Sequence, residues 1–219
     1  ILIKDEVREE AVSGIKSVSE AGIQTVMITG DNKLTATSIA KEIGLISSEE
    51  DIVLTSEELN KMSDAQVKKI IPKLKVVARS LPEDKKRLVI LSQELGLVTG
   101  MTGDGVNDAP ALKRADVGFA MGSGTEVAKE VSDIIILDDN FKSIVKTILF
   151  GRTIFKSIRK FIIFQLTVNL TAVSLSVIGP FFGITTPVTV IQMLWINMIM
   201  DTLAGVAYAY EPPLDSYMK

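Results

Sequence analysis

Cysteine and histidine are both absent from this sequence of 219 residues, and tryptophan occurs once. Without cysteine there is no disulfide framework and no thiol chemistry. The absence of both residues also excludes the usual ligand sets for zinc, copper and haem. Any metal bound by this chain would therefore be a hard cation held by oxygen atoms, such as magnesium or calcium.

Positive charge is not in excess either, because 24 basic residues are outnumbered by 27 acidic ones and the formal net charge is −3. A chain that binds nucleic acid would need a basic surface, so we expect no nucleic-acid partner. The sequence shows no signal peptide and begins with isoleucine instead of an initiator methionine. We therefore expect it to be a piece of a longer protein.

Charged residues are nearly absent from the last quarter of the chain. Residues 161–219 contain four Asp, Glu, Lys or Arg residues, and the other 47 lie in residues 1–160. Hydrophobic residues make up 47% of the whole sequence. This average combines a charge-rich soluble segment with a segment that resembles a membrane domain in composition.

Residues 1–140 alternate between short apolar runs and helical stretches. Nearly uniform apolar runs are typical of parallel strands that are buried on both faces, with the helices covering the sheet. We therefore predict an α/β domain with a parallel sheet over this range. The predicted strands are Ile23–Ile28, Ile52–Leu54, Lys75–Ala78, Leu97–Met101, Val117–Ala120 and Ile134–Leu137. A first helix is predicted from an apolar face that runs from Val7 to Val18. The other predicted helices are Leu34–Ile43, Ser56–Ile71, Pro82–Leu95 and Ala109–Lys113.

Two long apolar segments, at about residues 161–179 and 187–210, follow an amphipathic stalk helix predicted over residues 141–160. Each can cross the hydrocarbon core, which about 20 helical residues span. The stalk ends in a cluster of Arg and Lys residues, which places the start of the first span in the cytoplasm. We predict a multi-pass integral membrane protein with residues 1–160 and the C-terminus cytoplasmic. A buried hairpin of a large soluble protein is the alternative.

The strongest local signal for chemistry is the run TGDGVND at residues 102–108. It follows a predicted strand, and open α/β sheets place their sites at the carboxyl ends of strands. Asp104, Asn107 and Asp108 offer three oxygen-bearing side chains, and Gly103 and Gly105 permit a tight turn. The arrangement suits magnesium, which would also keep waters and take phosphate oxygens. A surface turn rich in Asp, Gly and Asn is the alternative.

Two weaker features, a turn after another predicted strand and a helical lysine, could bind phosphate. Thr29, Gly30 and Asp31 end another predicted strand before a helix, where a hydroxyl and backbone amides could receive a phosphate oxygen. Alone, this turn fits a simple helix cap equally well. Lys85 lies in the helix opened by Pro82 and could neutralise a phosphate, although alone it would be a solvated surface lysine. The glycine-rich turn at residues 122–126 fits a structural cap better than a site.

Asp201 is the only acidic or basic side chain between residues 161 and 210. A carboxylate in a membrane span costs at least ~2.5 kcal/mol by insertion scales, so it indicates a functional site. Asn197 lies four residues earlier on the same helical face. Asn169 in the preceding span could approach both of them. A polar contact between helices is the alternative, and it explains an unpaired aspartate poorly.

Together these motifs resemble the carboxyl-terminal half of the phosphorylation domain of a P-type ATPase, followed by its fifth and sixth transmembrane helices. The resemblance covers nearly the whole chain, and the long TGDGVNDAPALK string is highly specific. It is carried by MITGDN at 27–32, ARSLP at 78–82 with Lys85, MTGDGVNDAPALK at 101–113, GSGTEVAK at 122–129, DDNF at 138–141, MLWINMIMDT at 193–202 and EPP at 211–213.

The resemblance implies a haloacid-dehalogenase-like, Rossmann-type fold in which an aspartate is phosphorylated by ATP and then hydrolysed. In such families Asp104 would bind Mg²⁺, while Asn107 and Asp108 would complete and support the site. Thr29 and Lys85 would hold the phosphoryl group. These roles agree with phosphoryl transfer, which depends mainly on positioning and charge neutralisation.

The same resemblance assigns nucleotide contacts. Gly30 and Asp31 would help to position nucleotide and phosphate, and Asp5 and Arg8 match a family pattern near the start of the chain. Glu6 stands where that pattern has proline, which alters the stiffness of the hinge. The phosphorylated aspartate, the nucleotide-binding and actuator domains and the other transmembrane helices are absent. We therefore expect this fragment alone to be inactive and to need the remaining domains of its parent.

The membrane residues indicate which ion is transported. The run around Asn197 and Asp201 is similar to the sixth helix of calcium pumps, and Asn169 matches a calcium-ligand position in the fifth. Ala172 and Met200 replace the Glu and Thr of two-site reticulum-type pumps. Both replacements resemble the plasma-membrane type, which has one Ca²⁺ site and implies a location in the cell membrane. The secretory-pathway calcium/manganese type is the close alternative.

Two readings from other classes remain open at the level of sequence. One is a soluble haloacid-dehalogenase phosphatase fused to a membrane anchor, although Asp201 and Asn197 argue against an inert anchor. The other is a truncated, non-catalytic product that acts by association with other membrane proteins. An Asp-Lys-Thr-Gly-Thr sequence upstream of Ile1 in the parent gene would decide between an enzyme and an anchor.

Overall fold

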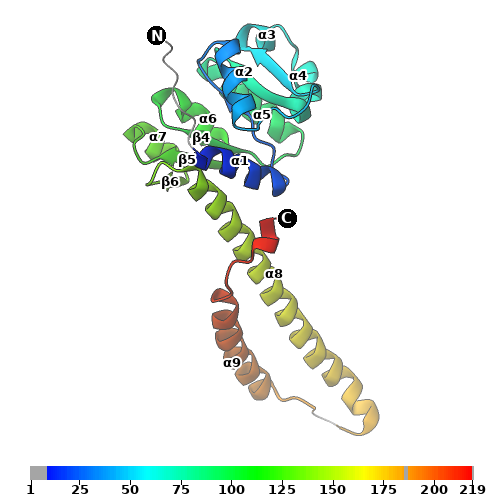
Figure 1. The fold of residues 1–219 in the computed structure, drawn as a ribbon. Helices are drawn as coiled ribbons and strands as arrows, with labels where there is room; N and C mark the ends of the chain where they lie inside the picture. Colours follow the sequence, from blue (N-terminus) through cyan, green and yellow to red (C-terminus); the bar gives the residue numbers. More distant parts are fainter. Residues whose placement is uncertain (1–8, 185–186, 219) are drawn as a thin grey trace. The chain divides into compact units, whose positions relative to one another are not determined.

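The computed structural model describes residues 9–184 and 187–218 (Figure 1). The described residues form two compact units that divide between Lys146 and Thr147. The predicted nucleotide contacts Asp5 and Arg8 lie outside the described residues, as does Val7 at the start of the first predicted helix.

The strands of the first unit pair in parallel, as predicted, and those described form two three-stranded sheets. The first sheet has the order β1 (Met27–Ile28), β3 (Leu74–Ala78) and β2 (Ile52–Thr55). The second has the order β4 (Gly100–Gly103), β5 (Val117–Met121) and β6 (Ile134–Ile136). Consequently β1 and β4 are edge strands among the strands described.

Helices connect these strands, as the alternating pattern predicted. In chain order they are α1 (Glu9–Glu20), α2 (Lys33–Glu42), α3 (Ser56–Asn60), α4 (Asp64–Ile70), α5 (Pro82–Glu94), α6 (Ala109–Arg114) and α7 (Glu126–Val131). Two short 3₁₀ helices, η1 (Ile71–Lys73) and η2 (Val106–Asp108), join them. Pro82 occupies the first turn of α5, where its missing N–H has no helical partner to lose.

The core of the first sheet shows why its central strand is apolar from Val76 to Ala78. Val76 and Ala78 of β3 pack with Ala36 and Ala40 of α2, whereas Val77 belongs to a separate cluster with residues of α3, α4 and α5. All three of these β3 residues are fully buried. Alternate residues of a strand point to opposite faces, so β3 is covered on both sides.

Several predicted elements differ in their bounds. The predicted strand Ile23–Ile28 is a strand only at Met27–Ile28, and the side chain of Gln24 donates instead to the carbonyls of Ile71 and Leu74. The strand predicted at Leu97–Met101 begins at Gly100, because Gly96 ends α5 with φ +78° and Leu97 N still bonds to Ser92 O.

The helix predicted over Ser56–Ile71 is two helices, α3 and α4. Ser63 begins α4 with a capping box in which its hydroxyl accepts from Gln66 N and the Gln66 side chain accepts from Ser63 N. A cap of this kind satisfies the free N–H groups of a new helix start. The chain therefore turns between Asn60 and Asp64 instead of continuing as one helix.

The second unit is a helical hairpin. The long helix α8 (Phe141–Ile178), which begins in the first unit, is followed by η3 (Gly179–Phe182), α9 (Val190–Ala209) and η4 (Asp215–Met218). In Figure 1, α9 runs back along α8 in the antiparallel direction. Both α8 and α9 are long and apolar enough to cross a membrane. Thr189 caps α9 with a capping box that includes Gln192.

Candidate functional site

The loop that follows β4 is built around Asp108. This carboxyl group is buried, and its Oδ1 accepts from Lys85 Nζ at 2.5 Å. Its Oδ2 accepts from the backbone N–H groups of Asp104 and Gly105, each at 3.3 Å. Asp108 therefore holds the loop in shape and orients the ammonium group of Lys85 at the same time.

Asp104 has the opposite environment, although it lies four residues away. It is exposed, and no hydrogen bond or ion pair of its carboxylate is found within residues 9–184 and 187–218. Its backbone carbonyl accepts from Thr125 N at 2.8 Å, which fixes the backbone while leaving the side chain free. Asn107 is exposed in the same loop.

The glycine-rich turn before α7 supports this loop. The sequence predicted only a helix cap for this turn. Thr125 does cap α7, since its hydroxyl accepts from Ala128 N at 3.4 Å. A side chain at Gly124 would put a Cβ atom 2.9 Å from the carbonyl oxygen of Asp104. Glycine is therefore required here because the two loops approach through their backbones.

The oxygen-bearing side chains of this loop fit part of a magnesium site. A free carboxylate at Asp104 and an accessible amide oxygen at Asn107 are the hard ligands that magnesium takes. Among the described residues, no group of three or more acidic, histidine or cysteine side chains could hold a metal ion. The other ligands would have to be waters and phosphate oxygens, as is usual for magnesium.

The loop that follows β1 forms a second group. Thr29 Oγ1 donates to Asp31 Oδ2 at 3.0 Å and accepts from Asp31 N at 3.1 Å. The N–H groups of Arg79 and Ser80 donate to the carbonyls of Asp31 and Thr29, both at 2.9 Å. A Cβ atom at Gly30 would meet nothing within 4 Å, so packing alone does not require glycine there.

Arg79 is a residue to which sequence reasoning assigned no role. Its backbone has φ +49°, a left-handed conformation that residues other than glycine rarely adopt. Together with Asn32, Lys33 and Leu81 it lines a broad groove of about 980 Å³ beside the Thr29 loop. Strained backbone of this kind persists where surrounding structure enforces it, often at functional sites. Its position directly after a buried strand was the available signal.

One segment of the chain links the two groups. Residues 79–80 hold the Thr29 loop through their backbone, and Lys85, a few residues later in α5, reaches Asp108 in the other loop. The structure thus brings Lys85, Asp104, Asn107 and Asp108 into one group. Thr29, Gly30 and Asp31 form the other, and the described interactions include no direct contact between the two.

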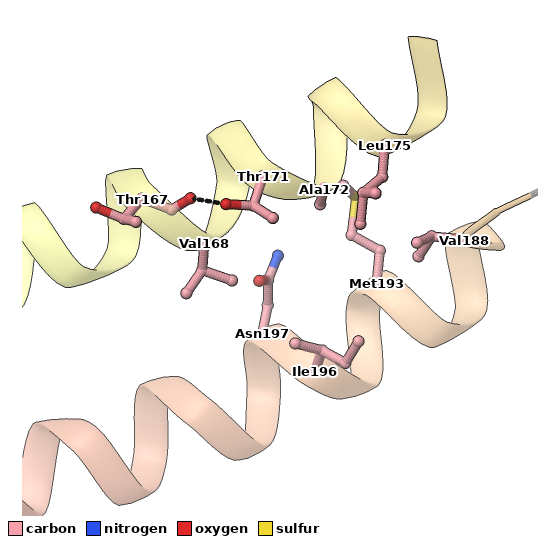
Figure 2. A pocket seen from close by; sticks show the side chains of 9 residues that line it. All are labelled: Thr167, Val168, Thr171, Ala172, Leu175, Val188, Met193, Ile196 and Asn197. Atoms are coloured by element: carbon pink, nitrogen blue, oxygen red, sulfur yellow. Dashed lines mark hydrogen bonds between the residues drawn. The ribbon is translucent and has the colours of Figure 1, made fainter. Parts of the chain in front are cut away.

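The hairpin contains a small apolar cavity of about 260 Å³ between α8 and α9 (Figure 2). Asn197 directs its amide group into the space between the helices. The hydroxyl of Thr171, on the facing wall, donates to Thr167 O at 2.8 Å. Ala172 also lines the cavity and presents only a methyl group.

The other two predicted calcium ligands are not part of this cavity. Asn169 is half-buried on α8, and Asp201 is exposed on α9. Neither lines the cavity that contains Asn197. This cavity therefore contains one of the three predicted ligands.

The segment after α9 is fastened to the basic part of α8, which sequence reasoning did not foresee. Glu211 pairs with Lys160 and accepts a hydrogen bond from Ser157 Oγ at 3.2 Å. Lys156 Nζ lies 3.7 Å from the ring centroid of Tyr217. The hydrogen bond from Lys160 lowers the pKa of Glu211, and the carboxylate in turn raises the pKa of Lys160.

Comparison with protein families gives matches over most of the chain. A model described as haloacid dehalogenase-like hydrolase matches residues 1–116, and a second model with this description matches residues 99–148. A model described as cation transporting ATPase, C-terminus, matches residues 185–219.

Similar proteins include calcium-transporting ATPase 2 of Schizosaccharomyces pombe, 49% identical, and the plasma-membrane-type calcium-transporting ATPase 4 of Arabidopsis thaliana, 48% identical. The human plasma membrane calcium-transporting ATPase 4 is 47% identical. Each match covers 99% of this chain, but the chain spans only 17%, 21% and 19% of the lengths of these relatives.

Among solved structures, the chain is similar to a zinc-transporting PIB-type ATPase in an E2.Pi state. The TM-score is 0.63 at 27% sequence identity, and the match covers 98% of this chain and 28% of that one. The similarity therefore extends over both units, the α/β unit and the helical hairpin.

Proposed function

The chain belongs to the haloacid dehalogenase-like hydrolase family, and from this premise we propose that it is part of an ATP-driven calcium pump of the P-type. It would supply half of the phosphorylation site together with the fifth and sixth transmembrane helices. The proposal rests on the similarity to calcium-transporting ATPases over 99% of the chain and on the two apolar helices. ATP would be the substrate, Ca²⁺ the transported ion and Mg²⁺ the cofactor.

The observation that carries the proposal is the contrast between Asp104 and Asp108 in one loop. Asp108 is buried and paired with Lys85, whereas the Asp104 carboxylate is exposed and fixed only through its backbone. A free carboxylate on a rigid loop beside an oriented lysine suits the binding of a hydrated cation and a phosphate. A purely structural turn would not need to keep one acid free while it buries the other.

Phosphoryl transfer depends on positioning and on neutralising the charge of the transferred group. Bound Mg²⁺ would supply positive charge beside the phosphate oxygens, with Asp104 and Asn107 as its protein ligands. Lys85 would place a second positive charge there, while Asp108 keeps the lysine side chain in position. Thr29 would turn its hydroxyl from Asp31 Oδ2 and donate a hydrogen bond to a phosphate oxygen instead. Gly30 and Asp31 would shape the loop that receives the phosphate.

The two sheets leave room for the missing part of this site. Both candidate loops follow edge strands, β1 and β4, which pair on one side only among the described strands. Open strand edges can pair with a further strand. A segment outside this chain that carries the acceptor aspartate could pair there and come to lie between the two loops.

The calcium site would lie in the hairpin and would also need groups from outside this chain. Calcium takes six to eight oxygen ligands, and Asp201, Asn197 and Asn169 supply only some of them. The amide of Asn197 already faces the space between α8 and α9. The methyl group of Ala172 on the same cavity offers no oxygen. We therefore propose one calcium site, completed by further transmembrane helices.

Substitution of Asp104 tests the phosphorylation site in the intact pump that contains this chain. Asp104→Asn removes a charge that would offset phosphate oxygens, and loss of one such group typically lowers the rate by about 10²–10³. We expect that loss in phosphoenzyme formation from ATP at physiological magnesium, with calcium binding retained. Glu49→Gln, which removes an exposed carboxylate from the turn before β2, is the matched control. Near-normal phosphorylation of Asp104→Asn would disprove the assignment.

A further inference from the structure

We propose that Asp84 is a positioning residue: its hydrogen bonds to α3 fix the start of α5 so that the next residue, Lys85, reaches Asp108. The positional part of this proposal concerns the chain alone. Its consequence for phosphoryl transfer rests on the function proposed above. Nothing in the motif assignments gives Asp84 a role.

Asp84 is the most deeply buried acidic residue described, with 1% of its surface exposed. Its Oδ2 accepts from Ser56 Oγ at 2.5 Å and from the backbone N–H of Leu81 at 2.8 Å. Its Oδ1 accepts from Asn60 Nδ2 at 2.9 Å. All of these donors are neutral, and no lysine or arginine within the described residues forms an ion pair with Asp84.

A simple helix cap would not require this arrangement. The hydrogen bond from Leu81 N already satisfies one free donor at the start of α5, and an exposed carboxylate could make it. Ser56 and Asn60 belong to α3, 28 and 24 residues away in sequence. A buried carboxylate is costly unless hydrogen bonds compensate for the lost water. The contacts to α3 provide that compensation and tie two separate helices together.

The position of Asp84 couples this tie to the candidate site. Asp84 lies in the first turn of α5, and Lys85 follows it directly. Lys85 and Asp108 are both largely buried, with side-chain exposures of 18% and 8%, and their charged atoms are 2.5 Å apart. Because both side chains are largely buried, the lysine has little free space in which to follow a shift of the helix start. Loosening the α3–α5 tie would therefore displace the lysine from Asp108.

Competitive acetylation of the 219-residue chain in lipid nanodiscs tests the positional claim directly. Mass spectrometry would compare the labelling rate of Lys85 with that of its exposed neighbour Lys86 in the same molecule. We expect Lys85 to be protected in the wild type and to approach the rate of Lys86 in Asp84→Ala. If Lys85 stays protected in a folded Asp84→Ala variant, the proposal is wrong.

A second variant covers the case in which Asp84→Ala fails to fold. The double substitution Ser56→Ala with Asn60→Ala cuts the tie to α3 but keeps the hydrogen bond from Leu81 N to Asp84. It should also expose Lys85 to labelling, whereas a cap acting alone would leave Lys85 protected. Asp51→Ala is the matched control, because Asp51 accepts two backbone N–H groups in a turn remote from α5. It should leave the Lys85 rate unchanged.

The functional consequence is measured in the intact pump as the rate of phosphoenzyme formation. Asp84→Ala should lower that rate by roughly ten- to a hundredfold, the range expected when a group near the chemistry is slightly misplaced. In a Lys85→Met background the same substitution should add little, because both changes act through one group. An equal loss in that background would overturn the proposal. If Lys85→Met itself has no effect, the proposed function fails while the labelling result still decides the positional claim.

Discussion

At the scale of single residues, the loop after β4 depends on a glycine at position 103. A Cβ atom there would lie 2.5 Å from Cβ and 2.7 Å from Cγ of Asp108. Gly103→Ala must therefore push Asp108 away from Lys85, and overpacking of this kind typically costs about 1–3 kcal/mol. We expect that loss of unfolding free energy in urea, measured by circular dichroism of the chain in detergent micelles.

Gly100→Ala is the control for this prediction, because it lies on the same strand and neither glycine has a positive φ. Its added Cβ atom would come no closer than 3.5 Å to the ring of Phe119, an ordinary contact. The control should unfold at nearly the same urea concentration as the wild type. Equal stability of the two variants would show that Asp108 moves aside freely and that the loop is not tightly packed.

The local pattern of this loop predicts a site, but only the family resemblance gave the two aspartates different roles. Asp104 and Asp108 are the same residue type, four positions apart in a glycine-rich turn. Lys85, 23 residues before Asp108, pairs with the buried aspartate. The backbone N–H of Thr125 holds the carbonyl of the exposed one, Asp104. Such partners become neighbours only when the sheet forms, so local patterns cannot identify them.

At the scale of elements, the segment after α9 should hold to α8 in a pH-dependent way. Lys160 lowers the pKa of Glu211. The pairing therefore stabilises the folded state at pH values above the ordinary pKa of glutamate. The stabilisation is lost as the pH falls through the lowered pKa. We expect the ¹⁹F signal of fluorotyrosine at Tyr217, which lies against Lys156, to shift across that acidic range.

Glu211→Gln separates this effect from other acid-induced changes. The glutamine cannot titrate, so the transition at Tyr217 should disappear and the signal should resemble that of the released segment at all pH values. A transition of the same size and midpoint in Glu211→Gln would show that another group, such as Asp215, controls the docking of the segment.

The elements differ in how well their sequences define them. The strand Leu74–Ala78 was predicted nearly correctly, because a strand covered on both faces is mostly apolar, and here only Lys75 departs from that pattern. The start of β4 was placed too early, because Leu97 and Val98 look like strand residues although 47% and 85% of their surfaces are exposed. Local patterns report apolar character, whereas pairing with β5 determines where the strand begins.

At the scale of the whole molecule, the two partial sites proposed above lie one in each of the two units. The α/β unit presents Asp104 and Lys85 but no acceptor aspartate, and the hairpin presents Asn197 and Asp201 without a full set of oxygen ligands. The fold class, the parallel strands and the apolar hairpin could be predicted from the sequence. The assembly of either proposed site could not, because in the proposed pump the remaining groups would belong to parts outside this chain.

The central claim is that these two partial sites belong to one calcium pump with a single membrane site. Equilibrium binding of labelled calcium to the intact pump, normalised to acid-stable phosphoenzyme, tests it most directly. We predict one calcium ion per phosphoenzyme, because Ala172 and Met200 bring no oxygen for a second site. Asp201→Asn should abolish both calcium binding and calcium-dependent phosphorylation, and Asp215→Asn should preserve them. A ratio of two, or calcium binding retained in Asp201→Asn, would contradict the account.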